Sequence, residues 1–128
     1  MELHRCLICI GSNFSQDEML TFARNELSAL FPDIIFGQEM VNPPLFFISN
    51  KSSFYNQLGI FHTTITSGEI QAACKDIERK AGRTPEDKIY EKVKLDIDLL
   101  QMDQQIFKPE DMKRAYIRKG MEELSSLS

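Results

Sequence analysis

The chain has 128 residues, the length of one ordinary domain, and its 42% hydrophobic and 27% charged side chains are close to globular averages. The net charge of −4 argues against general nucleic-acid binding. No apolar run reaches the roughly 18 residues that a membrane-spanning helix needs. We therefore expect a single domain over residues 1–128 in the cytoplasm, without a nucleic-acid or membrane partner.

Positive charge is concentrated late in the chain. Residues 1–78 carry 4 basic and 9 acidic side chains, whereas residues 79–119 carry 11 basic and 8 acidic ones. A small polyanion is therefore a better candidate partner than a long one.

The three cysteines, Cys6, Cys9 and Cys74, lie in apolar runs. Their spacing is typical of neither a metal site nor a disulfide framework. We expect them to be reduced core residues.

The first elements are a strand and a helix. Residues 3–10 predict a strand, which ends at the turn Gly11-Ser12-Asn13. Ser15 and Glu18 have the spacing of a capping box, in which each side chain bonds a free backbone N–H at a helix start. Leucine and alanine then recur at helical spacing, so the helix should run to about Phe31.

Two strands are expected next. Residues 34–41 predict the second strand, and Asn42-Pro43-Pro44 must form a loop because proline lacks the N–H that a sheet interior requires. Residues 54–66 are rich in aromatic and β-branched side chains and predict a third strand, interrupted near Gly59.

A second helix follows. Thr66 and Glu69 form another capping-box pattern, apolar residues continue at helical spacing to Ala81, and Gly82 supplies the C-terminal stop. Residues 84–92 are polar and contain a proline, so we expect a mobile loop.

The remaining elements complete the fold class. Residues 93–100 form the clearest strand pattern, and residues 110–124 predict a charged final helix. The order β-α-β-β-α-β is that of a ferredoxin-like α+β fold, an antiparallel sheet with helices packed on one face.

Two aspartates stand out in the last strand. From Val93 to Leu99 apolar and polar residues alternate, so Asp96 and Asp98 share a face with Lys94. One interpretation is the solvated side of a half-buried strand. However, aspartate is depleted in strands, and same-face neighbours stand only about 7 Å apart, where two carboxylates repel. The second interpretation is a magnesium site, because Mg²⁺ is usually bound by one or two carboxylates together with water and substrate phosphates.

The basic surroundings favour phosphate chemistry at this pair, since phosphoryl transfer depends on charge neutralisation and positioning. The basic residues nearby in sequence are Arg83, Lys88, Lys92, Lys94, Arg114, Arg118 and Lys119. No Walker-type phosphate loop is present. His4 and His62 lie in strand-like runs without a serine or cysteine in a nucleophile elbow, so a nucleophilic triad is not indicated.

Six short blocks follow one another between residues 7 and 100. They are Ile10-Gly11-Ser12-Asn13, Pro43-Pro44-Leu45, Phe54-Tyr55-Asn56, Ile77-Glu78, Gly82-Arg83 and Leu95-Asp96-Ile97-Asp98-Leu99-Leu100. In order and nearly in spacing they resemble the signature blocks of hydroxymethyldihydropterin pyrophosphokinase, a folate-pathway enzyme family.

The resemblance implies a Mg²⁺-dependent enzyme that transfers diphosphate from ATP, its co-substrate, to the hydroxymethyl group of 6-hydroxymethyl-7,8-dihydropterin, releasing AMP. It implies that Asp96 and Asp98 hold magnesium and that the Asn56 amide reads the polar edge of the pterin. Phe54 would form one aromatic wall of the pterin site and Tyr116 the opposite wall.

The resemblance also implies roles for residues around these sites. Pro43, Pro44 and Leu45 would shape the pterin pocket. Glu78, Arg83 and Leu99 would contact the nucleotide. Arg83 would be the basic catalytic residue that opens the catalytic loop, and we expect Lys92 and Lys94 to join it by compensating in part for loop arginines that this chain lacks.

The chain departs from the family pattern in its catalytic loop. Val93, Pro85 and Ile89 stand where the family usually has arginines, and lysine cannot reproduce the bidentate guanidinium fork. The alternative hypothesis is a non-catalytic relative that binds a pterin or nucleotide. A purely structural or interaction module is a third hypothesis, which predicts neither binding nor turnover.

Overall fold

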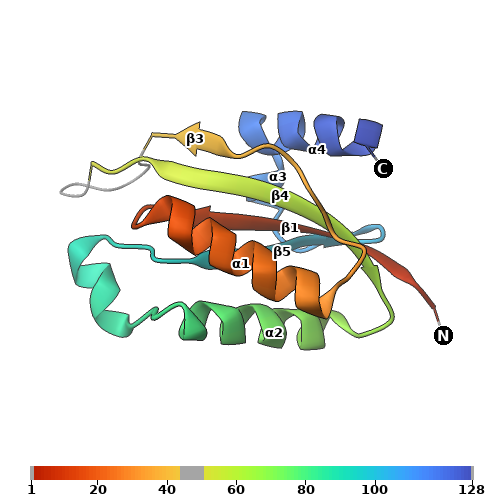
Figure 1. Cartoon of the computed structure of the whole chain (residues 1–128). Helices are drawn as coiled ribbons and strands as arrows, with labels where there is room; N and C mark the ends of the chain where they lie inside the picture. The colour runs from red at the N-terminus through yellow and green to blue at the C-terminus, as the bar shows by residue number, and fades with distance from the viewer. Residues whose placement is uncertain (1, 44–50, 128) are drawn as a thin grey trace.

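The computed structural model describes residues 2–43 and 51–127, drawn in Figure 1. The elements, in chain order, are β1 (His4–Ser12), α1 (Gln16–Leu30), β2 (Ile35–Phe36), β3 (Met40–Asn42), β4 (Phe54–Thr63), α2 (Ser67–Lys80), the 3-10 helix η1 (Pro85–Tyr90), β5 (Asp96–Met102), β6 (Gln105–Ile106), α3 (Pro109–Met112) and α4 (Ala115–Leu127). None of the helices in these ranges is long and apolar enough to cross a membrane.

The strands form one antiparallel sheet in the order β2-β4-β1-β5-β6, with β3 also paired to β4. Since β2 and β3 together replace the second strand of the expected pattern, this is the ferredoxin-like arrangement. The predicted α+β fold class is therefore confirmed.

Helices cover both faces of the sheet (Figure 1). The two helices of the ferredoxin-like unit, α1 and α2, pack on one face, as expected, and share a core with Ile8, Ile10 and Phe61. The C-terminal helix α4 lies outside that unit and covers the opposite face, where Leu58 packs with Ile117. In this second layer α4 packs against β4, and the short helix α3 lies against β5, the strand that carries the aspartates.

The predicted second strand over residues 34–41 is wrong, because the segment forms two short strands, β2 and β3. The chain leaves the sheet ladder at Gly37, whose N–H donates to the Leu58 carbonyl (2.9 Å). The Gln57 side chain then donates to the Gly37 carbonyl (2.7 Å). A side chain thus takes over the hydrogen bond that a continuous ladder would use.

The predicted interruption at Gly59 is also wrong, since β4 continues through it. Gly59 pairs with Ile8 on one side and Phe36 on the other. A Cβ atom at this position would lie 3.2 Å from both Ile34 and Phe36 side-chain carbons. The glycine allows close packing instead of breaking the strand.

One of the two predicted capping boxes is present. The Thr66 hydroxyl accepts from the Glu69 N–H and Glu69 accepts from the Thr66 N–H, both at 3.1 Å. The prediction at Ser15 is wrong: its φ of 47° is left-handed and its side chain makes no capping bond. A capping side chain reaches the helix from the extended backbone region, which Thr66 occupies and Ser15 does not.

The C-terminal third is more divided than expected. The loop predicted over residues 84–92 contains the 3-10 helix η1, which was not predicted, and the helix predicted over residues 110–124 is split into α3 and α4. β5 begins at Asp96 instead of Val93, and the short hairpin partner β6 was not predicted. The predicted strand and helix therefore exist with shifted boundaries.

Candidate active site

Three neighbouring strands bring the site residues into register. Gly11 on β1 pairs with Asn56 on β4 and with Asp96 on β5, and Cys9 pairs with Asp98. Since Gly11 has no side chain, only the backbone of β1 lies between the Asn56 amide and the Asp96 carboxylate. A Cβ atom on Gly11 would lie 2.9 Å from the Asn56 amide nitrogen.

A cavity of about 220 Å³ lies over Gly11, between these two side chains. It is lined by Cys9, Gly11, Asn42, Pro43, Phe54, Asn56, Asp96, Asp98, Leu100, Asp111, Arg114, Tyr116 and Ile117. The residues expected from the resemblance to contact a pterin are thus brought together with the acid pair. Pro44 and Leu45, expected in the same role, lie outside the described residues.

The amide of Asn56 is held by a second amide. The Asn42 Nδ2 donates to Asn56 Oδ1 at 2.9 Å, and Asn56 is buried. The aromatic residues come from different layers, Phe54 from β4 and Tyr116 from α4. Burial raises the pKa of Tyr116 to about 12, so its phenol is neutral near pH 7. This cavity combines apolar walls with fixed polar groups, the composition typical of small-molecule sites.

The two aspartates interact unfavourably as they stand. Burial, followed by the charge of Asp96, raises the pKa of Asp98 to about 7, and Lys108 opposes this rise only partly. A carboxyl group with such a pKa is stabilised by a nearby cation. Within the described ranges, no group of three or more His, Cys, Asp or Glu side chains is arranged to hold a metal. The pair still fits Mg²⁺, which commonly takes only one or two protein carboxylates.

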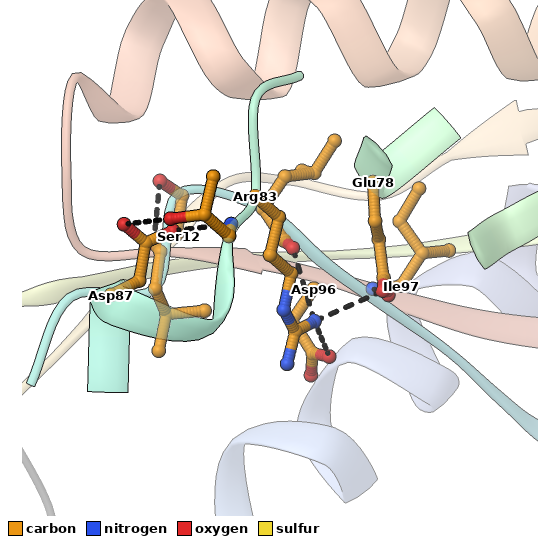
Figure 2. Close-up of polar contacts among 9 residues, drawn as sticks. Ser12, Glu78, Arg83, Asp87, Asp96 and Ile97 are labelled. Carbon is orange, nitrogen blue, oxygen red and sulfur yellow. Dashed lines mark hydrogen bonds and ion pairs between the residues drawn. The ribbon is translucent and has the colours of Figure 1, made fainter. Parts of the chain in front are cut away.

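Arg83 links the acid pair to α2 (Figure 2). Its Nη1 lies 3.0 Å from Asp96 Oδ1 and 3.0 Å from Glu78 Oε1. The other Glu78 oxygen accepts the Ile97 N–H at 2.8 Å. Both Glu78 oxygens are therefore already hydrogen-bonded within the protein. In this structure the Glu78 side chain stabilises the site and does not offer a free oxygen to a ligand.

A second cavity, of about 420 Å³, shares Asp96 and Asp98 with the first and lies toward α2. Its lining is Gln71, Lys75, Glu78, Arg83, Asp96, Ile97, Asp98, Leu99 and Lys108. The residues expected to contact a nucleotide, Glu78, Arg83 and Leu99, are all in this set. The acid pair thus lies between two spaces, one bounded by aromatic and amide groups and the other by basic groups.

The family model of 7,8-dihydro-6-hydroxymethylpterin-pyrophosphokinase (HPPK) matches residues 7–126, nearly the whole chain. The chain belongs to the HPPK family. This family comprises pyrophosphokinases, transferases of folate biosynthesis that use ATP as co-substrate. A search among curated proteins found no match.

Two basic residues expected at the HPPK catalytic centre lie elsewhere. The Lys94 ammonium donates to the Gly82 carbonyl (2.7 Å) and lies 3.5 Å from Asp87. The Lys92 ammonium lies over the Phe14 ring, 4.4 Å from its centroid. Neither residue lines the two cavities that contain the acid pair. Lys94 thus contacts η1 through Asp87, whereas Lys92 connects the residues after η1 to Phe14, just after the end of β1.

The residues that follow η1, Glu91 to Val93, are hydrogen-bonded to Asn13, directly after the end of β1. Asn13 is buried, and its Oδ1 accepts the Val93 N–H (2.6 Å) while its Nδ2 donates to the Glu91 carbonyl (2.9 Å). Its own N–H donates to the Val93 carbonyl (2.9 Å). At the other end, the Thr84 N–H donates to Asp87 (3.0 Å). In this HPPK chain the segment is thus held by backbone and amide contacts.

Several lining residues were missed from the sequence. Asn42 directly precedes the Pro43-Pro44 block, and Lys75 lies three residues before Glu78, on the same helix face, so local signals for both existed. For Arg114 and Lys108, nothing in the neighbouring sequence other than their positive charge indicated that they line a cavity. Gly11 was quoted within a block of the HPPK resemblance, but only the sheet register gives it a place between Asn56 and Asp96.

Proposed function

We propose that the chain transfers the diphosphate of ATP to the hydroxymethyl group of 6-hydroxymethyl-7,8-dihydropterin and releases AMP. The observation that carries this proposal is the register of Asn56, Gly11 and Asp96 across three strands. It puts an amide and a carboxylate on one face with no side chain between them. A flat polar heterocycle beside the amide would then point its substituent toward the acid pair.

On the pterin side, Asn56 binds the polar edge of the ring, because an amide supplies both a donor and an acceptor. Phe54 and Tyr116 form the two apolar walls. Pro43 shapes the entrance, and we extend this role to Pro44 and Leu45 from the family resemblance. The neutral phenol of Tyr116 fits stacking on an uncharged ring.

On the nucleotide side, Asp96 and Asp98 hold Mg²⁺, which neutralises charge on the phosphate chain when bound. With Mg²⁺ held by Asp96, the Arg83 guanidinium, 3.0 Å from Asp96 Oδ1, would be available to bind the phosphates. Glu78 and Leu99 border the nucleotide. Lys92 and Lys94 contribute by holding the η1 segment in position.

The test is magnesium-dependent AMP release from ATP and the hydroxymethyl pterin. Wild-type protein should release AMP, and Asp96→Asn or Asp98→Asn should abolish it, since each removes a metal ligand. Asp103→Asn is the matched control, because Asp103 lies in the turn after β5 and pairs with His4 at 2.6 Å. Absence of AMP release by the wild type would overturn the proposal.

A second candidate is a relative that binds these ligands without turnover. Two observations favour it. Lys92 and Lys94 make their contacts outside the two cavities. Positions 85, 89 and 93, where the family usually has arginines, are proline, isoleucine and valine. Calorimetry with the pterin and with Mg²⁺-ATP separates the two candidates. Binding without AMP release favours the second, and measurable turnover eliminates it.

A further inference from the structure

Two lysines of the described chain line the nucleotide-side cavity without forming an ion pair. Lys75 comes from α2 and Lys108 follows β6, and both line the cavity of about 420 Å³ beside the acid pair. In the described part of the chain, lysine ion pairs are made by Lys80, Lys94 and Lys113, and not by these two. Lys75 opposes the rise in the pKa of Glu78, and Lys108 opposes that of Asp98. Neither ammonium is held in an ion pair, so both remain available to an anion.

The charge of the cavity lining also favours an anionic ligand. Its lining holds three cations and three carboxylates, but Arg83 is already bonded to both Glu78 and Asp96. The three cations and three carboxylates balance, so with a Mg²⁺ ion on the acid pair the lining would carry a net charge of about +2. A cavity with that balance attracts a polyanion.

Two other lysines near the acid pair in sequence, Lys92 and Lys94, are engaged elsewhere, and Lys88 lines a different cavity. Lys94 bonds to Gly82 and Asp87, and Lys92 lies over Phe14. Moving either ammonium to the nucleotide-side cavity would break these contacts. Lys75 and Lys108 border the cavity already and need no such rearrangement.

We infer that Lys75 and Lys108 bind the polyphosphate chain of the nucleotide, supplying positive charge at the cavity in place of the loop arginines that are missing at positions 85, 89 and 93. This inference rests on the proposed function, and it names the residues that recognise the phosphates. Because ammonium groups act as point charges on flexible stems, this binding depends strongly on ionic strength.

The experiment uses the full chain and inorganic tripolyphosphate with Mg²⁺, followed by calorimetry. Lys75→Gln and Lys108→Gln should each weaken binding about fivefold, the size typical of a partly exposed charge pair, and the double variant about 20-fold. The double variant should also show a shallower dependence of affinity on salt concentration. Lys80→Gln, on the same helix but bonded to Glu26 and Asp76, is the matched control and should bind as the wild type does.

The outcomes are distinguishable from those of the proposed function. Unchanged tripolyphosphate affinity in the folded double variant, or no binding by the wild type, overturns the inference. Lysine-dependent tripolyphosphate binding without AMP release overturns the proposed function and supports the phosphate site. Thermal unfolding of each variant checks that it is folded.

Discussion

The backbone N–H of Ile97 donates a 2.8 Å hydrogen bond to Oε2 of Glu78 (Figure 2). Ile97 lies between the two aspartates, and the other oxygen of Glu78 bonds Arg83. One carboxylate on α2 therefore fixes both the strand that carries the acid pair and the guanidinium beside it. Burial raises the pKa of Glu78, although the Ile97 and Arg83 contacts oppose that rise.

Replacing Glu78 should destabilise the protein in a graded way. Glu78→Ala leaves the Ile97 N–H without its acceptor, so the free energy of unfolding should fall by about 1–3 kcal/mol. Glu78→Gln keeps an acceptor for Ile97 and should cost less. Denaturant unfolding measures both variants. Equal stability of the Ala variant and the wild type would contradict the bond's structural role.

Gly11→Ala should weaken pterin binding. The new Cβ would lie 2.9 Å from the Asn56 amide nitrogen, so the amide must shift from its position in the cavity. We expect about a tenfold loss of pterin affinity by calorimetry, the equivalent of 1.4 kcal/mol. Gly68→Ala is the matched control, since its Cβ would meet only Thr66 at 3.9 Å. A Gly11 variant with unchanged pterin affinity would show that the amide position does not matter.

Asn42→Ala should raise the KM for the pterin and leave the KM for ATP unchanged. The substitution removes the donor that bonds Asn56 Oδ1 at 2.9 Å and so frees the Asn56 amide to rotate. Loss of one hydrogen bond of about 1 kcal/mol corresponds to a roughly fivefold effect. Steady-state kinetics with each substrate varied in turn gives both constants. Asn25→Ala, on the exposed side of α1, serves as control, and an equal rise in both KM values would argue against a specific role.

Magnesium affinity should depend on pH near neutrality. Burial and the charge of Asp96 raise the pKa of Asp98 to about 7, and a metal binds only the ionised carboxylate. Affinity should therefore fall by about tenfold per pH unit below pH 7 and level off above it. Calorimetry in buffers of different ionisation enthalpy should detect proton release on binding near pH 7. Asp98→Asn should remove the dependence, whereas a flat wild-type profile between pH 6 and pH 8 would rule it out.

Local patterns explain which elements could be predicted. The capping box at Thr66 and the alternation around Asp96 depend on neighbours within a few residues, and both predictions hold. Ser15 has a similar local pattern but lies in a turn where the Ser12 hydroxyl bonds the Phe14 carbonyl (2.9 Å). The break at Gly37 depends on the Gln57 side chain, 20 residues later, which no local pattern contains.

The sequence by itself determined the β-α-β-β-α-β order of the main elements and the shared face of Asp96 and Asp98, because hydrophobic periodicity and strand alternation are local properties of the backbone. The tertiary structure decided what faces that pair. Asn56 and Gly11 come from strands far apart in the chain, and Lys75 and Lys108 from a helix and a loop. Antiparallel pairing and helix packing bring such segments together through contacts that no single segment contains, so the cavities form only when the sheet and its helices are assembled.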